Sequence, residues 1–155
     1  MTESSDAYAT VDELADWSPW ASFDDAAAIA PTSPGVYMMR AGGSIIYVGM
    51  AGERSGKGMR GRLAVYRTGK GAVSGFGEAV LDRALANEQF LRSQLEALLN
   101  ADARRAKTWA KDAIAWVQPE LRWAVCDDAD AAGQLEDDVV EILRTHGIWN
   151  RAARP

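Results

Sequence analysis

Two tyrosines stand ten residues apart in the segment PGVYMMRAGGSIIYVGM, which runs from Pro34 to Met50. Tyr37 lies in the run GVYMMR and Tyr47 in the run SIIYVG, and both runs are rich in residues typical of β-strands. A hairpin would bring the two phenols together if both face the same side of it. Because a free tyrosine, with a pKa of ~10, is a poor base at neutral pH, such a pair needs a nearby cation for catalysis.

The length of the turn decides which face each tyrosine occupies. A two-residue loop, Gly42-Gly43, would pair Tyr37 with Val48 and direct the phenols to opposite faces. A three-residue loop that also includes Ala41 would pair Tyr37 directly with Tyr47, and its last glycine would supply the left-handed conformation that such loops require. We expect the three-residue loop and therefore a shared face.

One acid falls on the apolar side of the last predicted helix, which covers residues 127–147. With about 100° per residue and Val139 as the reference, Glu136 projects at about +60°, beside Leu143. A carboxylate that faces a core costs several kcal/mol unless a positive group meets it. Glu136 is therefore either the partner of an arginine in a structural ion pair or a ligand of a hard cation such as Mg²⁺, which often takes only one or two protein carboxylates.

A basic segment lies inside an acidic chain. The whole sequence has a formal net charge of −5, but residues 40–70 carry +6, because seven basic side chains are balanced there only by Glu53. Such a segment is either a solvated basic loop or the footprint of nucleic-acid binding, in which case affinity falls steeply with salt. The seven basic residues are Arg40, Arg54, Lys57, Arg60, Arg62, Arg67 and Lys70.

The remaining patterns predict an α/β fold with a small, three-stranded, largely antiparallel sheet flanked by helices. Helical periodicity covers residues 76–117, with a possible cap at Asn87, and the run ELRWAVC alternates as a half-buried strand does. The 155 residues suffice for one domain with a real core. We expect that domain over residues 31–155, with an acidic N-terminal extension over residues 1–30 that packs on it.

Composition excludes several classes of protein and of site. The single cysteine, Cys126, excludes an internal disulfide and a cysteine-rich zinc site. No apolar run approaches the roughly 18 residues of a membrane span, and the acidic N-terminal residues lack the basic and apolar regions of a signal peptide. We expect an intracellular, cytoplasmic protein. The segment GKGMRG fits G-x-G-x-x-G but does not directly follow a strand, which argues against a dinucleotide site.

The pieces resemble the GIY-YIG nuclease superfamily. GVY at 35–37 and YVG at 47–49 resemble the two halves of the family signature. An arginine on the first helix in RLAVY, a glutamate on a later helix in LEDDVVEIL and an asparagine in IWNR follow in the family's order. The resemblance covers residues 34–70 and 119–151, and the helical segment 76–117 resembles an insertion before the third strand.

The resemblance implies a metal-dependent endonuclease that hydrolyses phosphodiester bonds in DNA. Tyr37 and Tyr47 would lie at the active site, where one of them helps to activate the attacking water. Glu136 would bind the single divalent metal, Mg²⁺ or Mn²⁺, which would account for its position on the apolar side of the helix.

Three further residues acquire roles from the resemblance. Arg62 would hold the scissile phosphate, and its spacing to Tyr66 favours it over Arg60. Tyr66 matches a family position that often carries a polar or aromatic group near the phosphate. Asn150 would brace the site by hydrogen bonds.

The chain departs from the family pattern at Met50, where many members carry a lysine directly after the second motif; Lys57 is the candidate to replace it. Nucleic acid, DNA above all, is the implied partner, and no membrane partner is expected. The alternative function is a catalytically inert nucleic-acid-binding or protein-interaction domain on the same fold. The residues expected to contact phosphates are Arg54, Lys57, Arg60, Arg67 and Lys70.

Overall fold

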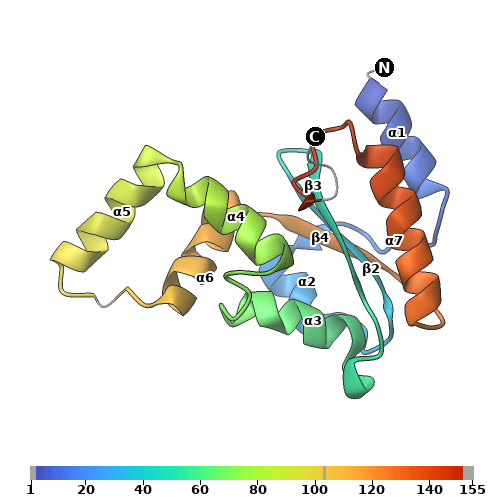
Figure 1. The fold of residues 1–155 in the computed structure, drawn as a ribbon, viewed down its shortest axis with the longest axis horizontal. Coiled ribbons are helices and arrows are strands. Elements are labelled where there is room, and N and C mark those ends of the chain that lie inside the picture. The colour runs from blue at the N-terminus through green and yellow to red at the C-terminus, as the bar shows by residue number, and fades with distance from the viewer. Residues whose placement is uncertain (1–2, 103, 152–155) are drawn as a thin grey trace.

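A computed structural model describes residues 3–102 and 104–151 (Figure 1). The first two residues of the predicted extension and the last four of the predicted domain lie outside the described residues. Four antiparallel strands form one sheet in the order β1-β4-β2-β3. The strands are β1 (Ala21–Ser22), β2 (Gly35–Ala41), β3 (Ser44–Ala51) and β4 (Glu120–Val125).

Helices cover both faces of this sheet, which confirms the predicted fold class (Figure 1). One core layer joins the sheet to α2, α3, α4, α5 and α6, and the other joins it to α1 and α7. The sheet also has a fourth strand, β1, which at two residues is too short to show an alternating pattern. The helices are α1 (Glu3–Asp12), α2 (Phe23–Ile29), the 3₁₀ turn η1 (Arg54–Gly56), α3 (Gly58–Arg67), α4 (Gly75–Leu85), α5 (Glu88–Leu99), α6 (Ala106–Val117) and α7 (Ala129–Leu143). None of these described helices is long and apolar enough to cross a membrane.

The predicted three-residue hairpin loop is wrong. Ala41 pairs with Ser44, so the turn is Gly42-Gly43, and both glycines take positive φ as a two-residue type I′ turn requires. A β-bulge between Met39 and Arg40 then shifts the register, so that Tyr47 pairs with Met39 and Tyr37 pairs with Gly49. Because Tyr37 and Met39 are two residues apart on one strand, Tyr37 and Tyr47 still share a face, as predicted.

The N-terminal segment packs against the α7 side of the sheet. The Tyr8 hydroxyl accepts a hydrogen bond from the Ile45 N–H at 2.9 Å, and Val11 is fully buried between α1 and that face. The Arg122 guanidinium lies over the rings of Trp17 and Trp20, with centroid distances of 5.0 and 4.7 Å. Aromatic and cation contacts thus hold this acidic segment on the sheet.

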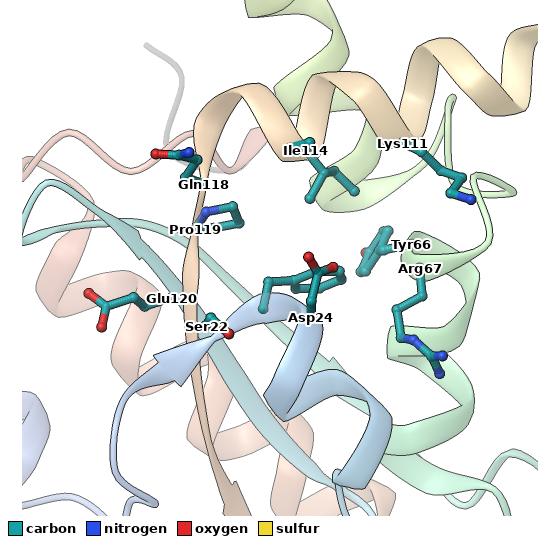
Figure 2. Close-up of a pocket in the computed structure, with 11 residues that line it drawn as sticks. Ser22, Asp24, Tyr66, Arg67, Lys111, Ile114, Gln118, Pro119 and Glu120 are labelled. Atoms are coloured by element: carbon teal, nitrogen blue, oxygen red, sulfur yellow. The ribbon is translucent and has the colours of Figure 1, made fainter.

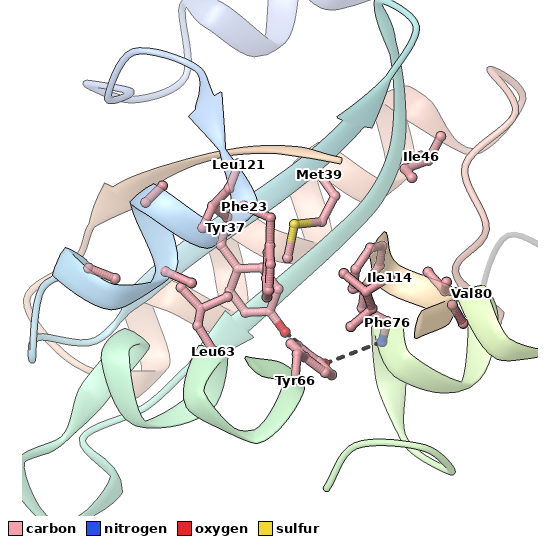
Figure 3. Packing of buried hydrophobic residues seen from close by; sticks show 14 of the residues in the cluster. Phe23, Tyr37, Met39, Ile46, Leu63, Tyr66, Phe76, Val80, Ile114 and Leu121 are labelled. Carbon is pink, nitrogen blue, oxygen red and sulfur yellow. Dashed lines mark hydrogen bonds between the residues drawn. The ribbon is translucent and has the colours of Figure 1, made fainter. Parts of the chain in front are cut away.

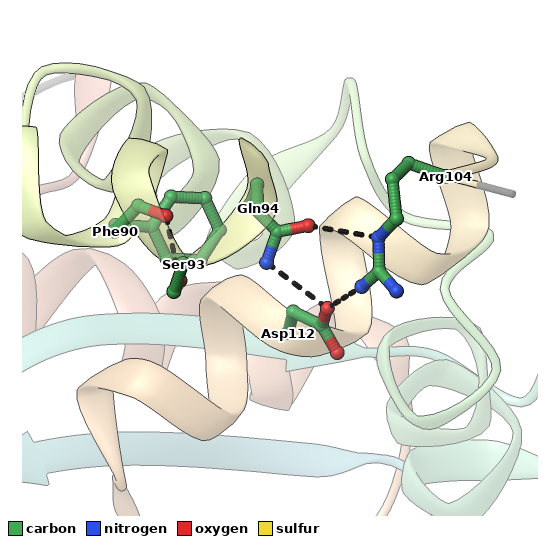
Figure 4. A network of polar contacts seen from close by, with 5 residues as sticks. All are labelled: Phe90, Ser93, Gln94, Arg104 and Asp112. Carbon is green, nitrogen blue, oxygen red and sulfur yellow. Dashed lines mark hydrogen bonds and ion pairs between the residues drawn. The ribbon is translucent and has the colours of Figure 1, made fainter. Parts of the chain in front are cut away.

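The helices of residues 76–117 form an arm that leaves the sheet and returns to it (Figure 1). Asn87 caps α5, as predicted, by accepting a hydrogen bond from the Phe90 N–H. The buried Gln94 amide donates to Asp112 and accepts from Arg104, and Arg104 also pairs with Asp112 (Figure 4). This polar network fastens the outgoing helix α5 to the returning helix α6.

Candidate active site

The Tyr66 hydroxyl is the centre of a hydrogen-bond network beneath the sheet (Figure 3). Arg62 and Tyr66 are four residues apart on α3 and so lie on one side of it, where Arg62 Nη2 donates to Tyr66 Oη at 2.9 Å. The Phe76 N–H, in the first turn of α4, donates to the same oxygen at 3.2 Å. Tyr37 Oη lies 3.1 Å away. Because the Tyr66 oxygen already accepts two hydrogen bonds, we infer that the Tyr66 O–H is the donor in its hydrogen bond with Tyr37 Oη.

Gly75 lies in close contact with three of the predicted site residues. A Cβ atom on Gly75 would lie within 3.1 Å of Tyr66 Oη, Arg62 Nη2 and Tyr47 Oη, and the backbone there has a φ of +53°. The adjacent Phe76 ring packs on the Tyr47 ring with their centroids 5.5 Å apart. The start of α4, outside the two motifs, therefore completes this side of the site.

Gly49, the glycine of the YVG run, lies against the first tyrosine. A Cβ there would collide with the ring and the hydroxyl of Tyr37, its partner in the hairpin register. A glycine at this position is thus a packing requirement of the buried tyrosine.

Burial keeps both hairpin phenols protonated at neutral pH. Tyr37 is only 1% exposed, and this burial raises its pKa well above the usual value; Tyr66 and Tyr47 raise it further and Arg62 opposes them. Tyr47 is half-buried, and burial also raises its pKa. Tyr66 adds to that shift, Arg62 opposes it and Glu136 again adds to it.

Glu136, on α7, is a half-buried carboxylate with no ion-pair partner among the described residues. Burial raises its pKa, Asp137 raises it further, and Arg62 opposes the shift. Within residues 3–102 and 104–151, Glu136 makes no hydrogen bond or ion pair, so the arginine pair considered from the sequence is not formed there. A bound cation would stabilise this charged form. No cluster of three or more His, Cys, Asp or Glu side chains in the described chain could hold a metal ion, so a cation here would use Glu136 with water and substrate oxygens, as Mg²⁺ does.

Asn150 and Trp149 clamp the strand that carries Tyr47. The Asn150 amide accepts from the Val48 N–H at 3.1 Å and donates to the Val48 carbonyl at 2.6 Å, while the Trp149 N–H donates to the Ile46 carbonyl at 2.7 Å. Tyr47 stands between these two anchored residues. The segment after α7 thus fixes the free edge of β3 on both sides of the second tyrosine.

The basic residues predicted to contact phosphates divide among three places. Arg60 Nε donates to the Ala30 carbonyl at 2.7 Å, which commits this arginine to holding α2 against α3. Arg67 lines a cavity between α2, α3 and α6. Arg54, Lys57 and Lys70 together line an open groove of about 550 Å³ along α3.

The two positions considered for the missing family lysine lie in different surroundings. Met50 packs in the core layer on the α7 side of the sheet. Lys57 lines the groove along α3, and within the described residues no hydrogen bond or ion pair joins it to either hairpin tyrosine.

Three residues of the arrangement were not singled out from the sequence. Gly75, Phe76 and Trp149 act through backbone groups or through close approach, and their types carry no chemical signal. The order Ser-Gly-Phe-Gly at 74–77 was the only hint, because two glycines at the start of a helix suit a close contact.

No protein-family model and no curated protein matches this chain. Among solved structures, it is similar to the GIY-YIG N-terminal endonuclease domain of UvrC from Thermotoga maritima, which was solved bound to its catalytic divalent cation, magnesium. The TM-score is 0.39 and the sequence identity is 19%, over 77% of this chain and 86% of that one. What this chain does is therefore inferred from its own residues.

Proposed function

We propose that this chain is a metal-dependent endonuclease that hydrolyses phosphodiester bonds in nucleic acid, DNA above all. The observation that carries this proposal is the convergence of Tyr47, Arg62 and Tyr66 around Gly75, beside the small cavity that Tyr47 lines. Glu136 also raises the pKa of Tyr47. Phosphodiester hydrolysis needs an activated water, donors on the phosphate oxygens and a cation near the developing negative charge. The chain offers a candidate group for each of these needs.

Tyr47 is better placed than Tyr37 to take a proton from water. Tyr47 lines a small cavity of about 100 Å³ beside Gly75 and Trp149, large enough for a water molecule. Tyr37 is almost fully buried, and its hydroxyl is hydrogen-bonded to that of Tyr66. We assign Tyr47 to proton transfer and the pair Tyr37–Tyr66 to positioning.

Arg62 is the candidate phosphate ligand. One of its N–H groups is used on Tyr66, and the guanidinium has further donors in a planar fork that suits two phosphate oxygens. Its place beside both tyrosines would put the phosphate next to the group that activates water. Arg60 instead directs its Nε to the Ala30 carbonyl, and no hydrogen bond in the described residues joins it to Tyr37, Tyr47 or Tyr66.

Glu136 is the candidate ligand for a divalent cation, because its half-buried carboxylate forms no hydrogen bond or ion pair in the described chain. A cation held there would supply Lewis-acid stabilisation of the transition state and would favour the Tyr47 phenolate. Asn150 keeps β3, and with it Tyr47, in place.

The groove along α3 is the candidate track for the nucleic-acid backbone. Arg54, Lys57 and Lys70 line it with the small residues Gly61 and Ala64, and no acid lines it. Cations beside a surface without bulky side chains suit close approach of phosphates. Lys57→Gln is expected to weaken binding of all sequences and to reduce the salt slope by about 1.

Cleavage assays on supercoiled plasmid and on branched DNA test the proposal. We expect nicking with Mg²⁺, loss of nicking with EDTA and with Glu136→Gln, and retention with the matched control Glu141→Gln. Glu141 lies on the same helix but on its exposed side, where it pairs with Arg144. Activity that survives both EDTA and Glu136→Gln would refute the metal assignment. Binding of DNA without any cleavage would identify the inert module instead.

A further inference from the structure

A cavity of about 620 Å³ lies between α2, α3, α6 and the start of β4 (Figure 2), and none of the catalytic roles above uses it. Buried side chains form its floor: Phe23, Tyr66, Ile114 and Pro119. Its rim is polar and exposed. Tyr66 belongs to both places, because its hydroxyl lies in the active-site network while its side chain lines this cavity.

The rim is cationic at one end. Arg67 from α3 and Lys111 from α6 extend at the same side of the cavity in Figure 2. In the described part of the chain, neither makes an ion pair. Glu120, at the opposite end, is neutralised by Arg40 at 2.8 Å. An anionic group would therefore bind at the Arg67–Lys111 end.

The side chains that could form hydrogen bonds with a ligand lie farther from that end. The Asp24 carboxylate points into the space between α2 and α6, and the Gln118 amide lies on the rim beyond it (Figure 2). A carboxylate only accepts hydrogen bonds, whereas an amide both donates and accepts. A lone phosphate would use neither the apolar floor nor Asp24, and a purely apolar ligand would leave both cations unused.

We propose that this cavity binds one unpaired nucleotide of the substrate strand, an inference that rests on the proposed nuclease function. The 5′-phosphate lies between Arg67 and Lys111, and the base lies on the apolar floor, with its edge toward Asp24 and Gln118. The volume is within the range of small-molecule sites, and apolar and aromatic side chains are the usual support for an unstacked base. Because a base inside a duplex cannot reach such a cavity, the substrate is nucleic acid with a bulged, single-stranded or extruded base near the scissile bond. The acceptor-only Asp24 favours a base edge that presents donors, as guanine does.

Calorimetric titration of the full chain with 2′-deoxyguanosine 5′-monophosphate tests the site without any cleavage. We expect binding that weakens about tenfold in Lys111→Gln, because one charged hydrogen bond is lost. Binding should weaken further in Ala115→Tyr, which fills the cavity from an exposed position on α6. The control Lys107→Gln makes the same charge change on α6 at a residue that does not line the cavity and should bind normally. Equal binding of inorganic phosphate and the nucleotide, or unchanged affinity in Ala115→Tyr, would overturn the proposal.

Cleavage of two duplexes then connects the cavity to the substrate. The natural chain should cleave a duplex with one bulged guanine at least about tenfold faster than the fully paired duplex, because extrusion of a paired base costs a few kcal/mol. Ala115→Tyr should abolish this preference by slowing cleavage of the bulged duplex; a preference that persists refutes the substrate assignment. If the nucleotide binds in the cavity but no nucleic acid is cleaved, the nuclease proposal fails while the nucleotide site stands.

Discussion

The hydroxyl groups of Tyr37 and Tyr66 lie 3.1 Å apart, although 29 positions separate the two residues in the sequence. Their rings meet edge to face with centroids 6.3 Å apart, one from β2 and the other from α3. The Tyr66 oxygen also accepts from Arg62 and from the Phe76 N–H. One oxygen atom thus connects the hairpin, the first helix after it and the arm of residues 76–117.

Tyr66→Phe removes that oxygen. Measuring both stability and cleavage in this variant should show separately what the hydroxyl contributes to folding and to activity. We expect a loss of about 1–3 kcal/mol in unfolding free energy, because the buried Phe76 N–H and Tyr37 hydroxyl lose their partner. We also expect DNA cleavage at least about tenfold slower, because Arg62 is no longer held in place. Urea unfolding and plasmid nicking measure the two effects.

Tyr8→Phe is the matched control for Tyr66→Phe. The Tyr8 hydroxyl also accepts a backbone N–H, that of Ile45, but on the α7 side of the sheet. It should lower stability without slowing cleavage. Equal loss of cleavage in both variants would mean that the Tyr66 effect is only structural.

Arg62 and Arg60 should respond differently to the same substitution. Arg62→Lys loses the planar fork at the proposed phosphate position, and we expect cleavage to fall about 10²-fold with little change in stability. Arg60→Lys loses the hydrogen bond to the Ala30 carbonyl, and we expect a stability loss of about 1 kcal/mol with cleavage retained. Steady-state cleavage and thermal unfolding of both variants check this. The opposite outcome would place the phosphate at Arg60.

Local patterns predicted the elements of the fold, since they depend on neighbours in sequence. The Asn87 cap of α5, for example, was predicted from the sequence. The hairpin register could not be predicted in this way. A bulge after Met39 shifts the pairing of the two strands, but the alternation of side chains in the stretches before and after it stays the same. The prediction that the two tyrosines share a face was right, but it was based on a three-residue loop that the structure does not contain.

Only part of the candidate site could be predicted from the sequence. Helical spacing joined Arg62 to Tyr66, and the helical projection singled out Glu136. The contributions of Phe76 and Trp149 come from backbone groups that tertiary packing brings to Tyr66 and Ile46. Side-chain type does not encode such contacts, so no reading of residue types could have found them.

Alkaline pH should destabilise the fold through Tyr37. Because burial raises its folded-state pKa above that of the unfolded chain, the unfolded chain loses this proton first, at a pH of ~10. The stabilisation is complete below that pH and is lost as pH rises toward the folded-state pKa, by up to about 1.4 kcal/mol per pH unit. Urea unfolding across this range should show a shallower decline in Tyr37→Phe. An identical decline in both chains would mean that the phenol is not buried.

Mg²⁺ should raise the thermal stability of the chain through Glu136. At a concentration about ten times its dissociation constant, an ion that binds only the folded state adds about 1.4 kcal/mol. Glu136→Gln should abolish this gain, and Glu141→Gln should keep it. In metal-free buffer at neutral pH, Glu136→Gln should not lower stability, because burial makes the charged carboxylate unfavourable above its unfolded-state pKa. Stabilisation of Glu136→Gln by Mg²⁺ would place the ion elsewhere.

Gly75→Ala tests whether the close contact of Gly75 with Tyr66, Arg62 and Tyr47 is needed for the reaction. Gly75 and Gly42 have nearly the same φ, +53° and +57°, so a methyl group costs about 1–2 kcal/mol of left-handed strain at either position. A Cβ at Gly42 meets nothing within 4 Å, whereas one at Gly75 meets Tyr66, Arg62 and Tyr47. Both variants should therefore lose stability, but only Gly75→Ala should also slow cleavage, by about 10²-fold, because displacement of reacting groups by about 1 Å has that cost. Cleavage at the natural rate in a folded Gly75→Ala variant would show that the phosphate reacts elsewhere.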